Sequence, residues 1–188
     1  MNNMHNLSNI VSADISDAEQ ICQLLNSAYR SHGGWTSEAD LVAGNRSSVD
    51  AIRASFTSPD SVYFVLKDGH RLLGCINIEL HGHTAHIGSF AVAPDTQGLG
   101  VGSKLLQHAE CYSQSYYKVD AFILSVLTAR KELISYYQRR GYAENGLTHP
   151  YPIHLNVGTP IVEGIELVEL HKPVSRNMPL PKPLPQED

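Results

Sequence analysis

The sequence is poor in cysteine and has no excess of positive charge. Its three cysteines, Cys22, Cys75 and Cys111, are far apart and form no Cys-x-x-Cys pair. An odd number of scattered cysteines does not build a disulfide framework and is typical of a reduced, cytoplasmic protein. The formal net charge of −5 argues against nucleic acid as a partner, because nucleic-acid-binding surfaces are strongly basic. It is compatible with a cationic or amine substrate.

Long apolar runs are also missing. No stretch approaches the roughly 20 apolar residues needed to cross a bilayer, and the polar segment 1–12 lacks the apolar core of a signal peptide. We therefore expect a cytoplasmic protein without membrane contact. Hydrophobic residues make up 42% of the 188, which is enough for the core of a single domain. We place this domain at residues 1–172.

The last residues differ in composition from the rest of the chain. Five of the ten prolines fall within residues 173–188, a density that cannot hold a packed core. We predict that this Pro-rich C-terminal tail is extended. It is either a free terminus, an arm on its own domain, or a segment that binds a groove of a partner.

A glycine-rich turn between a strand and a helix is the most informative feature of the sequence. Residues 89–109 read SFAVAPDTQGLGVGSKLLQHA: a short apolar strand, a turn and an amphipathic helix. The first turn of a helix has N–H groups without intrahelical partners, and the helix dipole adds positive potential there. Glycines let a ligand approach the backbone closely. Residues 97–103 therefore predict a site for a phosphate-bearing ligand.

The turn does not fit the two common nucleotide-binding motifs. Its residues 97–102, QGLGVG, are not Gly-x-Gly-x-x-Gly, and the acidic residue expected after a second strand is not evident. The turn is not a P-loop either, because Lys104 follows Ser103 instead of preceding a serine or threonine. On these residues alone, a purely structural glycine turn is the alternative.

Hydrophobic periodicity predicts the elements around this turn. Helices are expected at 21–29, 37–42, 49–56, 101–112 and from 128 through 140. A capping box at 16–19 would begin the first helix, and Thr128 would cap the last. A short strand is expected near Ile10. Strands at 62–67, 72–80 and 85–92 form an antiparallel meander, and two more strands are expected at 119–127 and 165–170.

Two segments together resemble the GNAT superfamily of N-acetyltransferases. Residues 92–102, VAPDTQGLGVG, resemble its motif A, a Val-x-Pro strand end followed by [Arg/Gln]-x-x-Gly-x-[Gly/Ala]. Residues 137–142, YQRRGY, resemble its second signature, a helix that ends in Tyr-x-x-x-Gly-[Phe/Tyr]. The two motifs occur in the order that the family requires, and the resemblance covers roughly residues 7 to 171.

The resemblance implies an α/β (α+β) fold and acetyl-CoA as cosubstrate. Its sheet is mixed and mostly antiparallel, with about six to seven strands, helices on both faces, and splayed strands 4 and 5. Backbone amides would hold the pyrophosphate at Gln97, Gly98, Leu99, Gly100, Val101, Gly102 and Ser103, and the pantetheine arm would pair along Phe90, Ala91 and Val92. Arg130 stands where many relatives have an asparagine. It would therefore either reach a cofactor phosphate or cover the start of a helix.

The implied reaction is acetyl transfer to a primary amine by direct attack in a ternary complex. Tyr137 occupies the family's usual general-acid position and would protonate the leaving thiolate. His86 aligns with a glutamate that serves as base in several relatives, and Glu79 on the preceding strand is the second candidate. Many members of the family have no single dedicated base.

The acceptor is predicted only as a small-molecule or peptide amine. Trp35 and Tyr151 lie in segments where acceptor loops would be, although Trp35 could equally be a packing anchor. No metal is expected, because His81, His83 and His86 straddle a turn without further ligands. Members of the family are often dimers, so a homodimer is compatible with the resemblance. The alternative function is a non-catalytic acyl-CoA-binding or sensing module.

Overall fold

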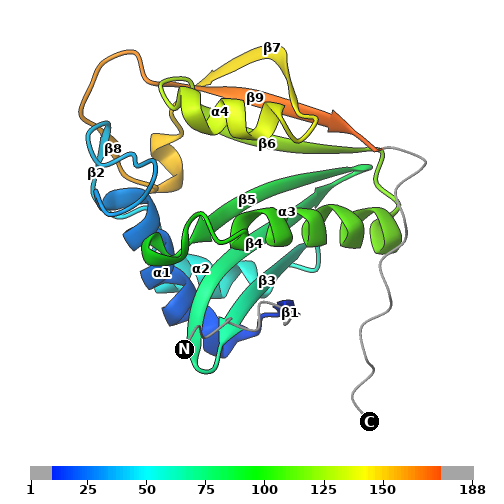
Figure 1. The fold of residues 1–188 in the computed structure, drawn as a ribbon. Coiled ribbons are helices and arrows are strands. Elements are labelled where there is room, and N and C mark those ends of the chain that lie inside the picture. Colours follow the sequence, from blue (N-terminus) through cyan, green and yellow to red (C-terminus); the bar gives the residue numbers. More distant parts are fainter. Residues whose placement is uncertain (1–9, 175–188) are drawn as a thin grey trace.

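The chain folds around one mixed β-sheet in a computed structural model that describes residues 10–174 (Figure 1). The strands lie in the order β1-β3-β4-β5-β6-β9-β7. Their bounds are β1 (Ile10–Ser12), β3 (Ser61–Asp68), β4 (Arg71–His81), β5 (Thr84–Val92), β6 (Ala121–Leu127), β7 (Ala143–Pro150) and β9 (Glu166–Pro173). Neighbouring strands are antiparallel except β5 and β6, which are parallel because a helix carries the chain across the sheet between them.

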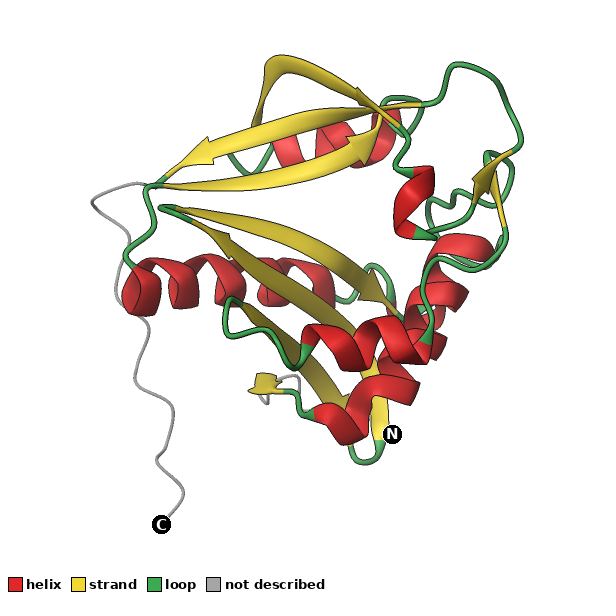
Figure 2. Ribbon diagram, turned by 180° about the vertical axis from the view of Figure 1, so that it is seen from behind, coloured by secondary structure: helices red, strands yellow, loops and turns green. Residues whose placement is uncertain are grey.

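Helices cover both faces of the sheet (Figure 2). The helices are α1 (Ala18–Arg30), α2 (Val49–Ser55), α3 (Val101–Tyr112) and α4 (Lys131–Gln138). Side chains alternate along β4, so Cys75 packs in an apolar cluster with α1 and α2, whereas Ile76 packs with α3 and α4. The predicted α/β (α+β) fold class, a mostly antiparallel sheet with helices on both faces, is confirmed.

Strands β5 and β6 pair over only three positions. Residues 84–86 are in register with residues 121–123. Beyond His86 the two strands diverge, and from Leu124 onward β6 pairs with β9 alone. These are the fourth and fifth strands in the order of the sheet, so the predicted splay is present and begins directly after His86.

A β-bulge distorts β5 where it leaves β6. Cys75 pairs with Ala91 whereas Asn77 pairs with Gly88, so β5 contains one extra residue at this point. Ser89 has a φ of 40°, in the left-handed region that residues with a side chain rarely adopt. The Cys75 thiol donates a hydrogen bond of 3.3 Å to the Ser89 carbonyl. This contact holds the strained backbone in place at the base of the opening.

Two of the predicted helix starts are wrong. The capping box is formed by Asp14 and Asp17 around the 3-10 turn Ile15–Asp17, not by residues 16–19, because the Asp14 side chain accepts the Ser16 amide at 2.7 Å. Thr128 does not cap α4. Its amide donates to the carbonyl of Glu166 at 2.9 Å, so Thr128 still belongs to the sheet and the helix begins only at Lys131.

Residues 37–42 form no helix. The amide of Val42 closes a single turn on the Glu38 carbonyl at 2.9 Å, and Val42–Ala43 then forms β2, which pairs with β8 (Thr159–Pro160). This turn does not continue into a helix, since β2 begins at Val42 and Gly44 follows with a φ of 81°. Strand β7 is not predicted by the sequence either, since its residues are exposed throughout and show no apolar alternation. The other predicted helices and strands, including the meander, are confirmed within a few residues.

The chain beyond β7 crosses to the α1 end of the molecule before it returns as β9 (Figure 1). Strand β9 continues to Pro173, and residues 175–188 of the Pro-rich tail lie outside the described residues. Within residues 10–174, the longest apolar helices are too short to span a bilayer.

Candidate active site

The glycine turn presents backbone N–H groups at the start of α3. Gly98 and Gly100 each have a φ of 84°, a conformation that residues with a side chain rarely adopt. A Cβ at either position would meet nothing within 4 Å, so open space lies beside both. Gly100 is the N-cap of α3 and provides no side-chain cap. The N–H groups of the first helical turn are therefore available to a ligand.

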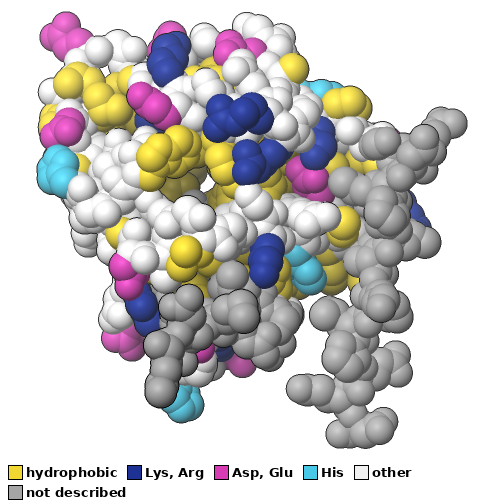
Figure 3. All heavy atoms as spheres, in the orientation of Figure 1, with side chains coloured by type: hydrophobic (Ala, Val, Ile, Leu, Met, Phe, Trp, Pro, Cys, Tyr) yellow, Lys and Arg dark blue, Asp and Glu magenta, His cyan; other side chains and the backbone are white. Residues whose placement is uncertain are grey.

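A cavity of about 310 Å³, here called the loop cavity, opens beside this turn. It is lined by β5, the turn, the start of α3, α4 and residues 35–36. Every residue that the sequence assigns to the cosubstrate lines it except Leu99, whose side chain is exposed. Figure 3 shows a hollow on this face, flanked by hydrophobic side chains, with Lys and Arg side chains close by.

Arg140 brings a cation to the wall of the loop cavity. Its guanidinium donates to the Ser103 hydroxyl at 2.8 Å and to the Tyr136 carbonyl at 2.9 Å. It also lies 3.4 Å from the centre of the Tyr136 ring, a cation–π contact. These contacts fix a positive charge beside the free amides of α3. The sequence motif contains Arg140 directly before Gly141, but the pattern alone does not distinguish it from a helix-terminal arginine.

A second cavity of about 510 Å³, here called the arginine cavity, lies in the opening between β5 and β6. Its walls come from the β5 bulge at 87–90, from β6 at 124–126, and from the end of β7 and the segment that follows it, within 149–157. Arg46, Arg130 and Glu38 also line it. Arg130 is a predicted site residue, whereas Glu38 and Arg46 come from loops that the sequence does not connect with a site.

Tyr137 lies where the two cavities meet. The residues that line both cavities are Tyr29, Phe90, Arg130, Leu133 and Tyr137. Tyr137 is 5% exposed, and burial raises the pKa of its phenol. Within residues 10–174 its hydroxyl has no hydrogen-bond partner. A protonated phenol is therefore available between two separately lined spaces.

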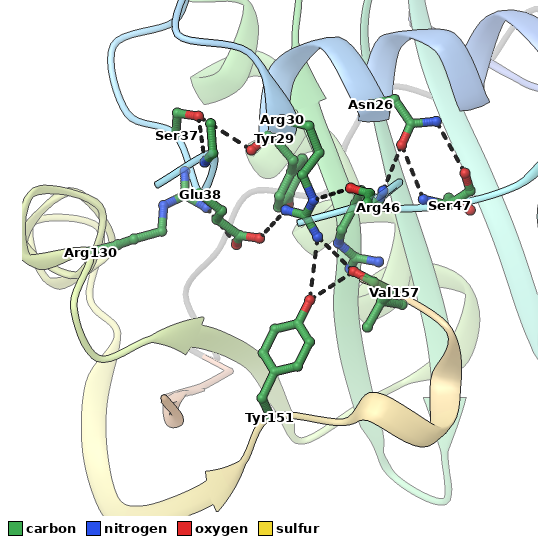
Figure 4. A network of polar contacts seen from close by, with 12 residues as sticks. Asn26, Tyr29, Arg30, Ser37, Glu38, Arg46, Ser47, Arg130, Tyr151 and Val157 are labelled. Atoms are coloured by element: carbon green, nitrogen blue, oxygen red, sulfur yellow. Dashed lines mark hydrogen bonds and ion pairs between the residues drawn. The ribbon is translucent and has the colours of Figure 1, made fainter. Parts of the chain in front are cut away.

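A buried ion-pair network forms one wall of the arginine cavity (Figure 4). The two carboxylate oxygens of Glu38 accept from Arg30 at 2.6 Å and from Arg130 at 3.1 Å. All three side chains are about nine-tenths buried. Arg30 also donates to the Val157 carbonyl at 2.6 Å, so the network ties α1 to the chain beyond β7.

Arg130 and Tyr151, both predicted site residues, belong to this network. Arg130 donates to Thr36 at 3.3 Å in addition to Glu38, lies at the N-terminus of α4 and lines both cavities. Tyr151 lines the arginine cavity, but its hydroxyl already donates to the Val157 carbonyl at 2.7 Å and accepts from Arg30 at 3.3 Å. Neither the guanidinium nor the phenol is free of protein partners.

Trp35 lines the loop cavity and not the arginine cavity. Its ring is 56% exposed, with its centre 6.1 Å from that of Tyr136. The backbone N–H of Trp35 donates to Oε1 of Gln97 at 2.5 Å, and the side-chain Nε2 of Gln97 donates to the Val92 carbonyl at 3.3 Å. Gln97 therefore ties the loop at 35 to the glycine turn and to β5, a role that the sequence does not predict.

The two candidate bases, Glu79 and His86, lie next to each other on the sheet, and neither of them lines the loop cavity or the arginine cavity. Glu79 of β4 pairs with His86 of β5, and the Glu79 side chain is 53% exposed and lies 3.7 Å from His81. His86 is half-buried, and burial is the main cause that lowers its pKa. His86 lies two residues before Gly88, the next residue on the same side of β5, which does line the arginine cavity.

The structure thus brings Tyr137 together with the glycine turn, and it leaves His86 and Glu79 outside both cavities. The residues that the sequence analysis missed are Tyr29, Glu38, Arg46 and Arg140. Tyr29 donates to the Phe90 carbonyl at 3.0 Å and lines both cavities. Among residues 10–174, no three His, Cys, Asp or Glu side chains are grouped so that they could hold a metal ion.

A model of the Acetyltransferase (GNAT) family matches residues 18–142 of the chain. This range includes α1, the glycine turn and α4. No curated protein matches the sequence.

Solved structures share the fold at low sequence identity. The structure of smu.2055 from Streptococcus mutans superposes with a TM-score of 0.67 at 20% identity, over 88% of this chain and 98% of that one. The ribosomal-protein-S18-alanine N-acetyltransferase of Escherichia coli gives 0.64 at 17%, over 92% and 99%. A spermidine N-acetyltransferase variant from Vibrio cholerae gives 0.65 at 16%, over 87% and 91%.

Proposed function

This chain belongs to the GNAT acetyltransferase family, and on that basis we propose that it transfers the acetyl group of acetyl-CoA to a primary amine in a ternary complex. The observation that carries the proposal is the position of Tyr137. Its phenol, without a partner among the described residues, lies at the junction of the loop cavity and the arginine cavity. Two substrates that enter from opposite sides would meet there.

The residues of the loop cavity fit acetyl-CoA. The open space beside Gly98 and Gly100, the free amides at the start of α3 and the guanidinium of Arg140 together suit a pyrophosphate. Phe90, Ala91 and Val92 line the path from this anion site toward Tyr137 and would hold the pantetheine arm. When bound, acetyl-CoA supplies an acetyl thioester with a good leaving group.

Tyr137 would act as the general acid. The amine nitrogen forms a bond to the carbonyl carbon, the carbon–sulfur bond breaks, and the thiolate leaves with the electron pair. Because burial raises the pKa of Tyr137, its hydroxyl keeps its proton at neutral pH and can donate it to the sulfur. The buried site also strengthens this hydrogen bond by excluding water.

The amine must lose a proton before or during attack, since an ammonium has no free electron pair. We favour His86 over Glu79 as the group that accepts this proton through water. The lowered pKa of His86 makes it neutral at pH 7, and it lies along β5 from Gly88 at the cavity wall. Glu79 is more exposed and pairs with His81. Because neither residue lines the cavity, we expect the base to contribute less than Tyr137.

The acceptor would occupy the arginine cavity and contact Tyr151, and Trp35 would border the entrance from the loop cavity. At about 510 Å³ the arginine cavity has the size of a small-molecule site. The neighbouring structures carry the names of a spermidine and of a ribosomal-protein alanine acetyltransferase. These acceptors differ in size and charge, so the neighbours do not select one for this chain.

The proposal is tested by incubating the full chain with acetyl-CoA and a panel of primary amines, and by measuring both free thiol and CoA affinity. An acetyltransferase releases CoA in an amine-dependent manner. The alternative, a non-catalytic acyl-CoA-binding or sensing module, binds CoA but releases no thiol with any amine. Failure to bind CoA at all would remove both functions.

A further inference from the structure

The arginine cavity has a local charge opposite to that of the whole chain. The sequence carries a net charge of −5, but the fully charged side chains that line this cavity are Arg46, Arg130 and Glu38. Arg30 lies directly behind Glu38 and adds another positive charge. Two arginines therefore share one carboxylate, and a third, Arg46, lies on the cavity wall. Net charge alone favours a cationic substrate, whereas the cavity does not.

The single carboxylate is not available to a ligand. One oxygen of Glu38 accepts from Arg30 at 2.6 Å and the other from Arg130 at 3.1 Å. The Glu38 side chain is about nine-tenths buried, which keeps both bonds out of water. A cationic ligand would have to displace an arginine to reach it. Glu169 contacts His149 of the cavity wall at 3.8 Å but does not itself line the cavity.

Arg46 is the arginine that has no counter-charge. Within residues 10–174 its guanidinium forms no ion pair and lies 5.2 Å from the centre of the Tyr29 ring. The Asn26 side chain accepts the amides of Arg46 at 2.6 Å and of Ser47 at 3.2 Å, and donates to the Ser47 carbonyl at 3.1 Å (Figure 4). The backbone of Arg46 is thus clamped to α1, and its side chain lies on the cavity wall.

We propose that the acceptor is a small amine that carries its own carboxylate or phosphate group, and that Arg46 binds this anion. This inference rests on the proposed function, because only an acetyltransferase would use the bound amine as an acceptor. A guanidinium recognises either oxyanion by charge-assisted hydrogen bonds. The arrangement makes Arg46 a specificity-determining residue, because it contacts the acceptor away from the amine.

The same charge distribution assists the chemistry at the amine. Nearby positive charge disfavours an ammonium and lowers its pKa. An acceptor whose anion meets Arg46 can therefore present a neutral amine to the thioester without a dedicated carboxylate in the cavity. A polyamine gains no such anchor and brings several cations next to Arg46 and Arg130. This explains how a cavity without a free acidic side chain can serve amine acetylation.

Matched pairs of amines that differ only in their anionic group test the inference. The carboxylate pair is β-alanine with propylamine, the phosphate pair is phosphoethanolamine with ethanolamine, and spermidine is the polycation. Calorimetry measures binding to the full chain, alone and saturated with CoA, and thiol release measures turnover with acetyl-CoA. We expect one or both anionic amines to bind about tenfold or more tightly than their neutral partners. Which pair shows the larger ratio identifies the anion.

Variants of Arg46 assign the preference to this side chain. Arg46→Gln should remove the ratio within each pair, and Arg46→Lys should restore part of it. Arg139→Gln, which removes an exposed arginine that lines neither cavity, should leave the ratio unchanged. Thermal unfolding checks that the variants are folded, as expected because Asn26 holds the backbone rather than the side chain.

The outcomes separate this inference from the proposed function. Equal binding within both pairs, tighter binding of spermidine, or an unchanged ratio in Arg46→Gln would overturn the inference. An intact anion preference without thiol release from any amine would support the anion site at Arg46 and overturn the acetyltransferase activity.

Discussion

The loop cavity and the arginine cavity meet at Tyr137 but present different groups to a ligand, backbone amides in the first and side chains in the second. The first takes most of its wall from one continuous stretch, 90–103, and presents backbone amides shaped by Gly98 and Gly100. The second takes its wall from strands and loops that are far apart in the sequence, and presents side chains such as Arg130, which Glu38 holds. Binding in the first depends on backbone conformation, and binding in the second depends on the identity of individual side chains.

This difference suggests a division of labour. A backbone cradle binds any ligand with the same phosphate group, which suits a cosubstrate common to a family. Side chains from variable loops can change without disturbing that cradle, which suits an acceptor that differs among relatives. If the two cavities are separable, a substitution in one should leave binding in the other unchanged.

Tyr137→Phe should give the largest effect, because this residue lies at the junction. Removing a positioned general acid is expected to lower kcat by about 10²-fold or more. CoA affinity should change little, since the ring remains and the lost hydroxyl has no partner within residues 10–174. Steady-state kinetics and CoA titration measure the two quantities.

Tyr136→Phe is the matched control for Tyr137→Phe. Tyr136 neighbours Tyr137 on α4 and lines the loop cavity, but among residues 10–174 its hydroxyl forms a hydrogen bond only with Ser103, at 3.4 Å. Its loss should leave kcat within a few fold. If both substitutions lower kcat equally, the phenol of Tyr137 has no special role and the two cavities do not meet at a general acid.

Glu38→Gln should give the next largest effect, on stability rather than on chemistry. Two arginine side chains that are about nine-tenths buried would lose their shared counter-charge. Breaking such a buried pair costs about 3 kcal/mol of the free energy of unfolding. Urea denaturation measures the change. Asp50→Asn, which breaks an exposed 4.0 Å pair with Arg53, is the control and should have little effect.

A near-neutral Glu38→Gln variant would contradict the view that the arginine cavity depends on this network. The variant should also leave CoA binding intact where the protein is folded, because Glu38 does not line the loop cavity. Loss of CoA affinity in the folded variant would show that the two cavities are not separable.

The two cavities also differ in how far the sequence predicts them. The glycine turn and Tyr137 are local patterns, so a strand, a Gly-rich turn and a helix end can be recognised from a few consecutive residues. The arginine cavity depends on contacts between residues about 90 to 130 positions apart, such as Glu38 with Arg130 and Arg30 with Val157. No local pattern encodes these contacts.

The sequence-based predictions for residues 37–42 and for β7 fail because tertiary contacts determine the structure of both segments. Residues 37–42 have helical spacing, but the ion pairs of Glu38 and the pairing of β2 with β8 give them a different structure. Strand β7 lacks apolar alternation because it is an exposed edge strand held by β9. In both places tertiary contacts outweigh local propensity, and the first of them includes Glu38 on the wall of the arginine cavity.

Arg140→Gln should weaken the loop cavity alone. The guanidinium is the charged group that supplements the backbone amides there, so its removal should raise the KM for acetyl-CoA about tenfold, the value of one charge-assisted hydrogen bond. The kcat and the acceptor preference should be unchanged. Arg139→Gln, next along the chain but outside both cavities, should leave this KM as it is. A shift in acceptor preference with Arg140→Gln would break the separation between the two cavities.

His86→Gln should give the smallest effect, because His86 lines neither cavity and would act only through water. We expect a loss of a few fold in kcat/KM, well below the roughly 10²-fold of a base in direct contact. Burial and His81 lower the pKa of His86, while Glu169 and Glu79 oppose this, so its neutral form persists to a pH below the usual value for histidine. The wild-type kcat/KM should therefore rise with pH and level off already below the usual pKa of histidine, and His86→Gln should remove that rise. Glu79→Gln tests the other candidate. If Glu79→Gln abolishes the rise and His86→Gln preserves it, Glu79 rather than His86 accepts the proton of the amine.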